Sequence, residues 1–316
     1  MKVNYTIIIP YFNSPYLLKR CLKSIPLKND LQIIVVDDCS PISEAYSEIV
    51  SDYSKLGVEF YQTDKNSGAG CARNIGLKQA KGKWLIFADS DDYFNPCFED
   101  MLNNYVDSDY DVVYFNASSQ DTETCINTKR SSYINSWIDG YQEDPLSFEY
   151  HLRYLYGEPW GKMIKHNLVQ KHDIKFEETI IHNDTQFSYQ IGFYADKIFA
   201  DKHAIYCITD RANSVSKTVS VERLLTRTKV FCKKYEWLTT RGIPYKLEGL
   251  AASGLNTFRK NMDTVNYNKC LDIFKSFNIN LKEIDWYFAQ YYKKPSWFYI
   301  LKIAFKNWLL KWVNRF

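Results

Sequence analysis

The sequence predicts an α/β fold, a mostly parallel sheet with helices on both faces, followed by a mainly helical C-terminal region. Short apolar, β-branched runs alternate with amphipathic segments through the first 115 residues, which is typical of parallel sheets. The runs are almost continuously apolar, as expected for strands buried on both faces. The chain has 316 residues, 46% hydrophobic and 24% charged. It is long enough for one large domain plus a smaller one, and its composition excludes disorder.

The predicted elements follow in chain order. We expect strands at residues 5–10, 31–36, 58–62, 84–88 and 111–115. Helices are expected at about 14–25, 43–56 and 67–80, from 96 onward, and at 146–156 and 184–194. Ser14 as N-cap and Pro15 at the first helical position mark the start of the first helix. Residues 117–145 are polar and poorly periodic, so we expect an irregular segment there. From about residue 219 the pattern is mostly helical.

Charge and cysteine usage exclude several protein classes. With 40 Lys+Arg against 37 Asp+Glu, the net charge of +3 is too small to indicate a nucleic-acid-binding protein. The eight cysteines form no CxxC pair and no zinc-ligand spacing. No uncharged apolar stretch of about 20 residues exists to span a membrane, and no signal peptide is apparent. We therefore expect a cytosolic protein with reduced cysteines.

An acidic cluster follows the fourth predicted strand. Asp89-Ser90-Asp91-Asp92 places two carboxylates one residue apart at a strand end, where both can address one divalent cation. Mg²⁺ and Mn²⁺ prefer oxygen ligands and are usually shared with substrate phosphates. In parallel sheets, ligands bind beyond the carboxyl ends of the strands. The sequence therefore predicts a metal–diphosphate site here; the alternative is a turn in which Asp92 caps the next helix.

Two further motifs follow the second and third strands. Asp37 and Asp38 could accept hydrogen bonds from a ribose hydroxyl or a pyrimidine N–H, or they could simply form a turn. The Gly68-Ala-Gly segment resembles a phosphate cradle, but Arg73 replaces the third glycine of a dinucleotide fingerprint. This argues against NAD binding. Arg73 could face a base or phosphate; alternatively, it lies on the solvent face of a helix.

Together these segments resemble the inverting family 2 glycosyltransferases, which have the GT-A fold. The resemblance rests on four motifs at successive strand ends, strongly over residues 4–115 and more faintly to about 216. They are Ile-Ile-Pro10-Tyr11-Phe-Asn13, Val-Val-Asp37-Asp38-Cys-Ser40, Asn66-Ser-Gly68…Ala-Arg73-Asn74-x-Gly76 and Phe-Ala-Asp89-Ser90-Asp91-Asp92. It implies donor-binding roles for Pro10, Tyr11, Asn13, Asp37, Asp38, Gly68, Arg73, Asp89 and Ser90. It also implies Mn²⁺ or Mg²⁺ at Asp91, with Asp89 contacting ribose or a metal-bound water.

The fainter part of the resemblance adds three segments. Pro159-Trp160-Gly-Lys162 is similar to the family's segment behind the sugar site, with core packing as the alternative. Asp184 matches the catalytic base, although Asn183 stands where an acidic residue is usual; the alternative is a helix N-cap. Arg211 lies in a segment similar to the one that closes over the diphosphate, and its alternative is a surface turn.

The resemblance implies a metal-dependent, inverting transfer of a sugar from a nucleotide-diphospho-sugar, most simply a UDP-sugar, to a hydroxyl of a growing glycan. The acceptor would be a lipid-linked capsule, lipopolysaccharide or other cell-surface polysaccharide, extended at the cytoplasmic face of a bacterial plasma membrane. Two alternatives stay open: a sugar-phosphate nucleotidyltransferase, and a non-catalytic sugar-nucleotide-binding or membrane scaffold protein. The sequence names neither the sugar nor the oligomeric state.

The implied organisation has three parts. Residues 1–216 form the catalytic domain, with a nucleotide-binding half (1–115) and an acceptor half (116–216), and residues 217–292 form a helical region. Residues 293–316 are expected to form a basic amphipathic helix on an anionic membrane, with packing on this chain or a second subunit as the alternative. No acidic residue follows Asp285. The basic residues are Lys293, Lys294, Lys302, Lys306, Lys311 and Arg315, beside a helical stripe of Phe298, Leu301, Phe305, Trp308, Leu309, Trp312 and Phe316.

Overall fold

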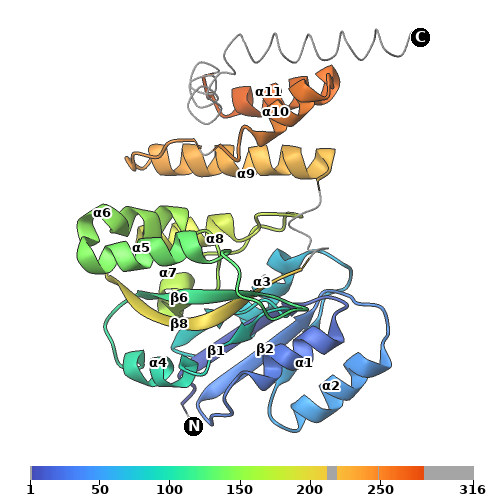
Figure 1. Cartoon of the computed structure of the whole chain (residues 1–316), viewed down its shortest axis with the longest axis vertical. Helices are drawn as coiled ribbons and strands as arrows, with labels where there is room; N and C mark the ends of the chain where they lie inside the picture. Colours follow the sequence, from blue (N-terminus) through green and yellow to red (C-terminus); the bar gives the residue numbers. More distant parts are fainter. Residues whose placement is uncertain (1, 212–218, 248, 281–316) are drawn as a thin grey trace. The chain divides into compact units, whose positions relative to one another are not determined.

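A computed structural model describes residues 2–211, 219–247 and 249–280. The chain divides into two compact units, one before and one after the boundary between residues 218 and 219 (Figure 1). The first unit holds the sheet and every site residue predicted above. The second unit is helical.

The first unit is built on one eight-stranded sheet with the order β3-β2-β1-β4-β7-β6-β8-β5. Strands β1 to β4 run parallel to one another, whereas β7 runs antiparallel to both of its neighbours, β4 and β6. Strands β6 and β8 are parallel, and the short β5 pairs antiparallel with β8. The strands are β1 (Tyr5–Tyr11), β2 (Leu31–Asp37), β3 (Glu59–Gln62), β4 (Trp84–Phe87), β5 (Tyr93–Phe94), β6 (Val112–Asp121), β7 (Lys162–Lys165) and β8 (Ile198–Asp210).

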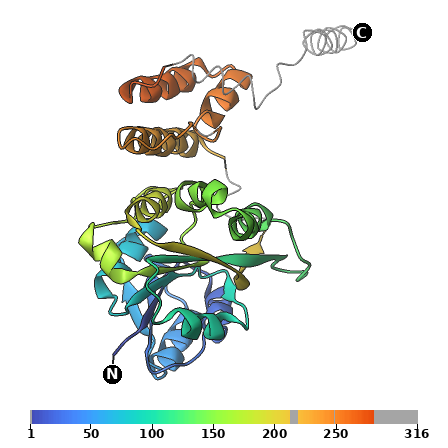
Figure 2. The same cartoon turned by 90° about the vertical axis from the view of Figure 1, so that its left-hand side faces the viewer.

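Helices lie on both faces of this sheet (Figures 1 and 2). Over strands β6 and β8, helices α5 and α6 lie on one side and α4 on the other. This confirms the predicted fold class. The helices are α1 (Pro15–Lys23), α2 (Glu44–Ser54), α3 (Ala69–Gln79), α4 (Phe98–Tyr105), α5 (Ser132–Glu143), α6 (Pro145–Tyr150), a π-helical turn η1 (His151–Leu155), α7 (His166–Lys171) and α8 (Thr185–Tyr194).

The central strands explain the continuous apolar runs, because both of their faces are buried. Ile7, Ile8 and Ile9 of β1 are fully buried. A Cβ built on Gly76 of α3 would lie 2.4 Å from Ile8 Cγ2, so α3 approaches β1 as closely as a glycine permits. Burial on both faces fixes the register of these strands, and hence the positions of the loops that follow them.

The structure corrects the prediction for residues 117–145. Strand β6 continues to Asp121 and α5 spans Ser132–Glu143, so most of this segment is regular rather than irregular. Only Ile134 and Ile138 of α5 are buried, which explains its weak periodicity. The helix expected at 146–156 is divided into α6 and the π-helical turn η1.

The second unit has a hydrophobic core of its own. The described residues of this unit form α9 (Val221–Thr239), α10 (Ser253–Lys260) and α11 (Thr264–Ser276). Phe231, Leu255, Phe258 and Phe274 are among its buried residues. In the described part of the chain, no helix has both the length and the apolar character that a membrane span requires. The helix predicted at 293–316 lies outside the described residues.

Candidate active site

The loops that follow β1, β2 and β4 meet at one edge of the sheet. The amide of Asp38 donates to the Tyr11 carbonyl (2.8 Å), and the amide of Asn13 donates to Ser40 Oγ (2.8 Å). Asn13 is exposed and has a positive φ of 45°, a conformation that asparagine tolerates well. Adjacent parallel strands therefore bring the motifs after strands one, two and four together, as the sequence predicts.

Asp37 and Asp38 organise the backbone of this edge. The Asp37 carboxylate accepts the Ser40 amide (3.0 Å) and thereby closes a turn. Asp38 accepts the amides of Gly68 (2.6 Å) and Ser67 (2.9 Å) and so fixes the chain ahead of α3. Gly68 has a φ of +87°, which favours glycine at this position. Both carboxylates are buried and lie beside the loop in which a nucleotide is expected.

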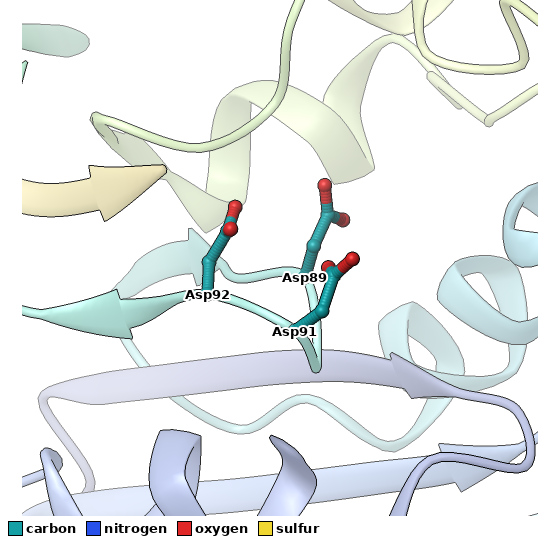
Figure 3. A group of neighbouring side chains, drawn as sticks. All are labelled: Asp89, Asp91 and Asp92. Carbon is teal, nitrogen blue, oxygen red and sulfur yellow. The ribbon is translucent and has the colours of Figure 1, made fainter. Parts of the chain in front are cut away.

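The acidic cluster projects from a single turn after β4. Carboxylate oxygens of Asp89, Asp91 and Asp92 lie within 4.8 Å of one another, and the three side chains extend from the same side of the turn (Figure 3). Asp92 is buried and accepts the Thr209 amide (2.7 Å) and the Tyr206 hydroxyl (3.0 Å). It therefore anchors the turn to β8. The alternative in which Asp92 caps the next helix is wrong, since the N-cap residue of α4 is Cys97.

Arg73 crosses from α3 to the acidic cluster. Its guanidinium forms an ion pair with Asp89 (2.5 Å) and donates to Asn183 Oδ1 (2.8 Å), and only 4% of the residue is exposed. The alternative with Arg73 on a solvent face is therefore wrong. Asn183, which departs from the family pattern, serves here as a neutral acceptor for Arg73.

A second arginine neutralises the next carboxylate. Arg211 Nη2 lies 2.6 Å from Asp91 Oδ2. The backbone of Asp91 is held as well, because its carbonyl accepts from Thr209 Oγ1 (2.5 Å) and from the Arg20 guanidinium of α1. Asp89 and Asp91 thus each have a guanidinium as a counter-charge. The Asp89 and Asp91 side chains are themselves partly exposed, which leaves both carboxylates accessible to a ligand.

Asp184 occupies the N-cap position of α8, but its side chain makes no capping hydrogen bond. Loss of hydration raises the pKa of Asp184 to about 6. Nearby Arg73 opposes this shift, whereas Glu158 and Asp89 add to it. Asp184 therefore shares the electrostatic environment of the acidic cluster.

The remaining predicted residues line or support this region. Trp160 is buried and stacks on Tyr206 with ring centroids 5.5 Å apart, so it packs in the core directly behind the cluster. Lys162 is buried, and its ammonium donates to the Tyr156 and Glu158 carbonyls (2.7 and 2.6 Å). Pro10 is buried within β1, and Tyr11 stacks on Tyr46 of α2 (4.6 Å). Ser90 lies partly exposed in the acidic turn.

Sequence reasoning missed Tyr206 and Arg20. The Tyr206 hydroxyl accepts the Asp89 amide (2.8 Å) and donates to Asp92, so it joins the two ends of the acidic turn. Tyr206 lies in an apolar stretch of β8 and reads as an ordinary core residue. Arg20 lies in the last turn of α1, where a basic residue is usually explained by the helix dipole.

We expect Tyr206→Phe to damage both the fold and the site. The substitution removes a partner from two buried polar groups, so the free energy of unfolding should fall by about 1–3 kcal/mol. The displaced turn should lower kcat/KM about tenfold or more. Urea unfolding and nucleoside diphosphate release measure the two effects. Tyr105→Phe is the matched control, since Tyr105 donates to Asp201 (2.6 Å) away from the acidic turn. Equal losses of activity in both variants would contradict a specific role for Tyr206.

A cavity of about 860 Å³ lies at the other edge of the sheet and contains none of the predicted site residues. Three of its lysines already face carboxylates, in the pairs Lys81–Glu59 (3.2 Å), Lys83–Asp107 (3.5 Å) and Lys165–Asp111 (3.7 Å). These pairs offset much of its positive charge, and we assign the cavity no role.

Comparison with known proteins agrees with this geometry. A family model described as glycosyl transferase family 2 matches residues 6–172, more than half of the chain. The chain belongs to this family. The match includes the strands and loops that carry Asp37, Asp38, Arg73 and the acidic cluster. The resemblance inferred from the sequence is thus confirmed.

Relatives from bacteria match this chain over parts of their length. The EpsH protein of Bacillus subtilis is 24% identical over 212 residues, which cover 64% of this chain and 59% of EpsH. The poly(ribitol-phosphate) beta-N-acetylglucosaminyltransferase TarS of Staphylococcus aureus is 37% identical over 99 residues, 29% of this chain and 17% of TarS. The chain therefore spans less than two thirds of either relative.

Solved structures confirm the GT-A fold. Residues 1–349 of S. aureus TarS in complex with UDP-GlcNAc match with a TM-score of 0.61 and 20% identity, covering 87% of this chain and 80% of the TarS chain. A mannosyltransferase of Pyrobaculum calidifontis, in complex with GDP-Man and Mn²⁺, matches with a TM-score of 0.51 and 13% identity. The match covers 97% of this chain and 87% of the mannosyltransferase chain.

Proposed function

We propose that this chain is a metal-dependent, inverting glycosyltransferase that moves a sugar from a UDP-sugar to a hydroxyl of a glycan. The observation that carries the proposal is the grouping of two arginine-paired carboxylates, Asp89 and Asp91, with an uncapped Asp184 whose pKa is raised. Family membership and the fold support it. The TarS structure with UDP-GlcNAc motivates a UDP-sugar as the first donor to test.

The acidic turn fits a divalent cation. Asp89 and Asp91 offer carboxylate oxygens at a partly exposed strand end, and oxygen is the ligand that Mn²⁺ and Mg²⁺ prefer. Asp92 has its oxygens engaged by β8, which leaves Asp89 and Asp91 as the residues that would hold the ion. A bound cation would supply positive charge for the departing diphosphate. Arg211, now paired with Asp91, is then available to a phosphate as well.

Asp184 is suited to act as general base. Its carboxylate makes no capping hydrogen bond, and a pKa of about 6 keeps it largely ionised at neutral pH while making it a stronger base than an ordinary aspartate. Arg73 lies close enough to influence Asp184 and also binds Asp89, so it links the proposed base to the proposed metal ligand. Asp184 would take the proton of the acceptor hydroxyl as that oxygen attacks the sugar.

A nucleoside diphosphate release assay with a panel of sugar nucleotides tests the proposal. We expect release with at least one UDP-sugar in the presence of Mn²⁺ or Mg²⁺, faster with an acceptor glycoside, and a product whose anomeric configuration by NMR is opposite to that of the donor. Binding of a sugar nucleotide without release would favour a non-catalytic binding protein. Formation of a sugar nucleotide from a nucleoside triphosphate would favour a nucleotidyltransferase, although β1 leads into Pro10-Tyr11-Phe12-Asn13 rather than a glycine-rich basic loop.

The pH dependence of transfer follows from Asp184. Only the ionised carboxylate accepts a proton, and its pKa of about 6 lies above the ordinary value for aspartate. We therefore expect kcat/KM to be level above about pH 7 and to fall about tenfold per unit below pH 6. The measurement is a rate profile from pH 5 to 8.5 at constant ionic strength, with the donor Kd followed as a control. A level profile down to pH 5 would contradict Asp184 as the base.

We further propose that the acceptor is a lipid-linked surface glycan and that the enzyme works on an anionic membrane. The relatives' names motivate a surface polymer, since TarS acts on poly(ribitol-phosphate). Residues 293–316 contain six basic and no acidic residues together with seven apolar side chains at helical spacing. Basic residues beside large apolar ones favour binding to anionic lipid.

Removal of residues 295–316 should abolish this membrane binding while leaving transfer to water-soluble acceptors intact. Each Lys or Arg near an anionic leaflet contributes about 1 kcal/mol, which salt screens. Co-sedimentation with anionic vesicles and with neutral vesicles measures the membrane binding of the full and the truncated chain. The full chain should bind only the anionic vesicles, and less at high salt. If the full chain ignores both, or if truncation unfolds the protein or splits a dimer, the segment is a packing surface instead.

A further inference from the structure

The loop that joins η1 to β7 is fixed by contacts from three directions. Lys162 Nζ donates to the Glu158 carbonyl (2.6 Å), and Ser188 Oγ of α8 donates to the Gly157 carbonyl (2.5 Å). The Tyr156 hydroxyl donates to the Trp160 carbonyl (3.2 Å), and Gly161 has a φ of +67°. These contacts hold the backbone, so the position of the loop does not depend on the Glu158 carboxylate.

The Glu158 carboxylate is directed by one side chain from another element. The Tyr133 hydroxyl of α5 donates to Glu158 Oε1. In the part of the chain that the structure describes, no basic residue forms an ion pair with Glu158, and no donor is assigned to its second oxygen. Glu158 is partly exposed, and Tyr133 is 44% exposed, so this pair opens to solvent.

The loop that carries Glu158 contacts α8, the helix that begins at the proposed base Asp184. Ser188, which contacts the Glu158 loop, lies one helical turn after Asp184, and its amide donates to the Asp184 carbonyl (2.9 Å). Glu158 is also among the charges that raise the pKa of Asp184. A second carboxylate beside a base costs electrostatic energy. Tyr133 orders the Glu158 carboxylate, and its second oxygen has no donor assigned among the described residues, so that oxygen can accept a hydrogen bond from a bound ligand.

We propose that Glu158, directed by Tyr133, binds a hydroxyl of the acceptor next to the hydroxyl that reacts. This inference rests on the proposed function and specifies the acceptor end as a neutral polyol, a sugar or alditol with a second hydroxyl near the nucleophile. The carboxylates of Glu158 and Asp184 accept from hydroxyls and repel phosphate or carboxylate groups. Glu158 is thus a specificity residue and Tyr133 a positioning residue.

The test compares Glu158→Gln and Tyr133→Phe with the wild type, using the fastest donor from the release assay and p-nitrophenyl glycosides as acceptors. We expect Glu158→Gln to raise the acceptor KM about 10–100-fold, the worth of a charge-assisted hydrogen bond, with the donor Kd within about twofold. Tyr133→Phe should raise the acceptor KM by less, with kcat nearly unchanged. Glu59→Gln is the matched control, because Glu59 accepts from Tyr61 (2.8 Å) at the start of β3.

An acceptor that lacks one hydroxyl sharpens the result. For the analogue without the hydroxyl that Glu158 binds, wild type and Glu158→Gln should have the same acceptor KM. An unchanged acceptor KM in Glu158→Gln, with an active wild type, would overturn this inference alone. A loss in kcat of about 100-fold or more at constant KM would also overturn it, because Glu158 would then be the base. Absence of diphosphate release by the wild type would overturn the proposed function as well.

Discussion

Asp184→Asn should lower kcat for transfer by about 10²–10⁴-fold while the sugar nucleotide binds almost normally. The amide keeps the size of the side chain and removes only its capacity to accept a proton. Because the side chain makes no capping hydrogen bond, the helix loses nothing. Single-turnover kinetics and donor titration measure the two quantities. A weak donor Kd with near-normal turnover would make Asp184 a donor-binding residue.

The same variant should be at least as stable as the wild type at neutral pH. Because its pKa is raised in the folded state, Asp184 stabilises the fold at low pH, and this contribution is lost as pH rises through about 6. Asparagine avoids that loss, so the Tm at pH 7.5 should be unchanged or higher. Asp144→Asn is the matched control: Asp144 is an N-cap that does accept a backbone amide (3.3 Å, from Ser147), and its substitution should leave kcat unchanged.

Asp91→Asn should reduce divalent-dependent transfer by about 100-fold or more, since a metal ion supplies several kcal/mol of charge stabilisation. The fold should survive, because the Asp91 backbone is held through its carbonyl by Thr209 and Arg20 rather than through its carboxylate. Nucleoside diphosphate release is measured at a series of Mn²⁺ concentrations, with chelator-treated wild type as the reference. Asp111→Asn, which weakens an ion pair with Lys165 (3.7 Å) on the same sheet, is the control. Full activity of Asp91→Asn in excess chelator would contradict the metal role.

The fold could be predicted where burial on both faces makes strands continuously apolar, as in β1 and β2. It could not be predicted for β6 beyond residue 115, where most of the strand is polar. There Asn116 donates to Asp139 (3.3 Å) and Ser119 Oγ donates to the Thr128 carbonyl (2.9 Å). Long-range pairing with β8 also holds this part of β6 in the sheet. Partners so distant in the sequence leave no local periodicity.

The candidate site also contains some residues that the sequence predicts and others that it does not. Asp89, Asp91 and Arg73 stand at strand ends or a helix start, and topology alone brings such positions together. Tyr206 and Glu158 could not be predicted from the topology, because each contacts a partner from another element of the fold. The ends of the contact between Tyr206 and Asp92 are 114 residues apart in sequence, and those of the contact between Tyr133 and Glu158 are 25 apart.

We propose that Asp91 holds the metal ion and that Asp184 acts as the base. Calorimetric titration of one UDP-sugar tests this assignment most directly. The UDP-sugar is titrated into wild type, Asp91→Asn and Asp184→Asn, each in a buffer that contains Mn²⁺. We expect wild type and Asp184→Asn to bind within about twofold of each other and Asp91→Asn to bind at least about tenfold more weakly. Removal of Mn²⁺ should bring all three to the same weak affinity. If Asp184→Asn loses donor binding while Asp91→Asn keeps it with and without Mn²⁺, the assignment of these two carboxylates is wrong.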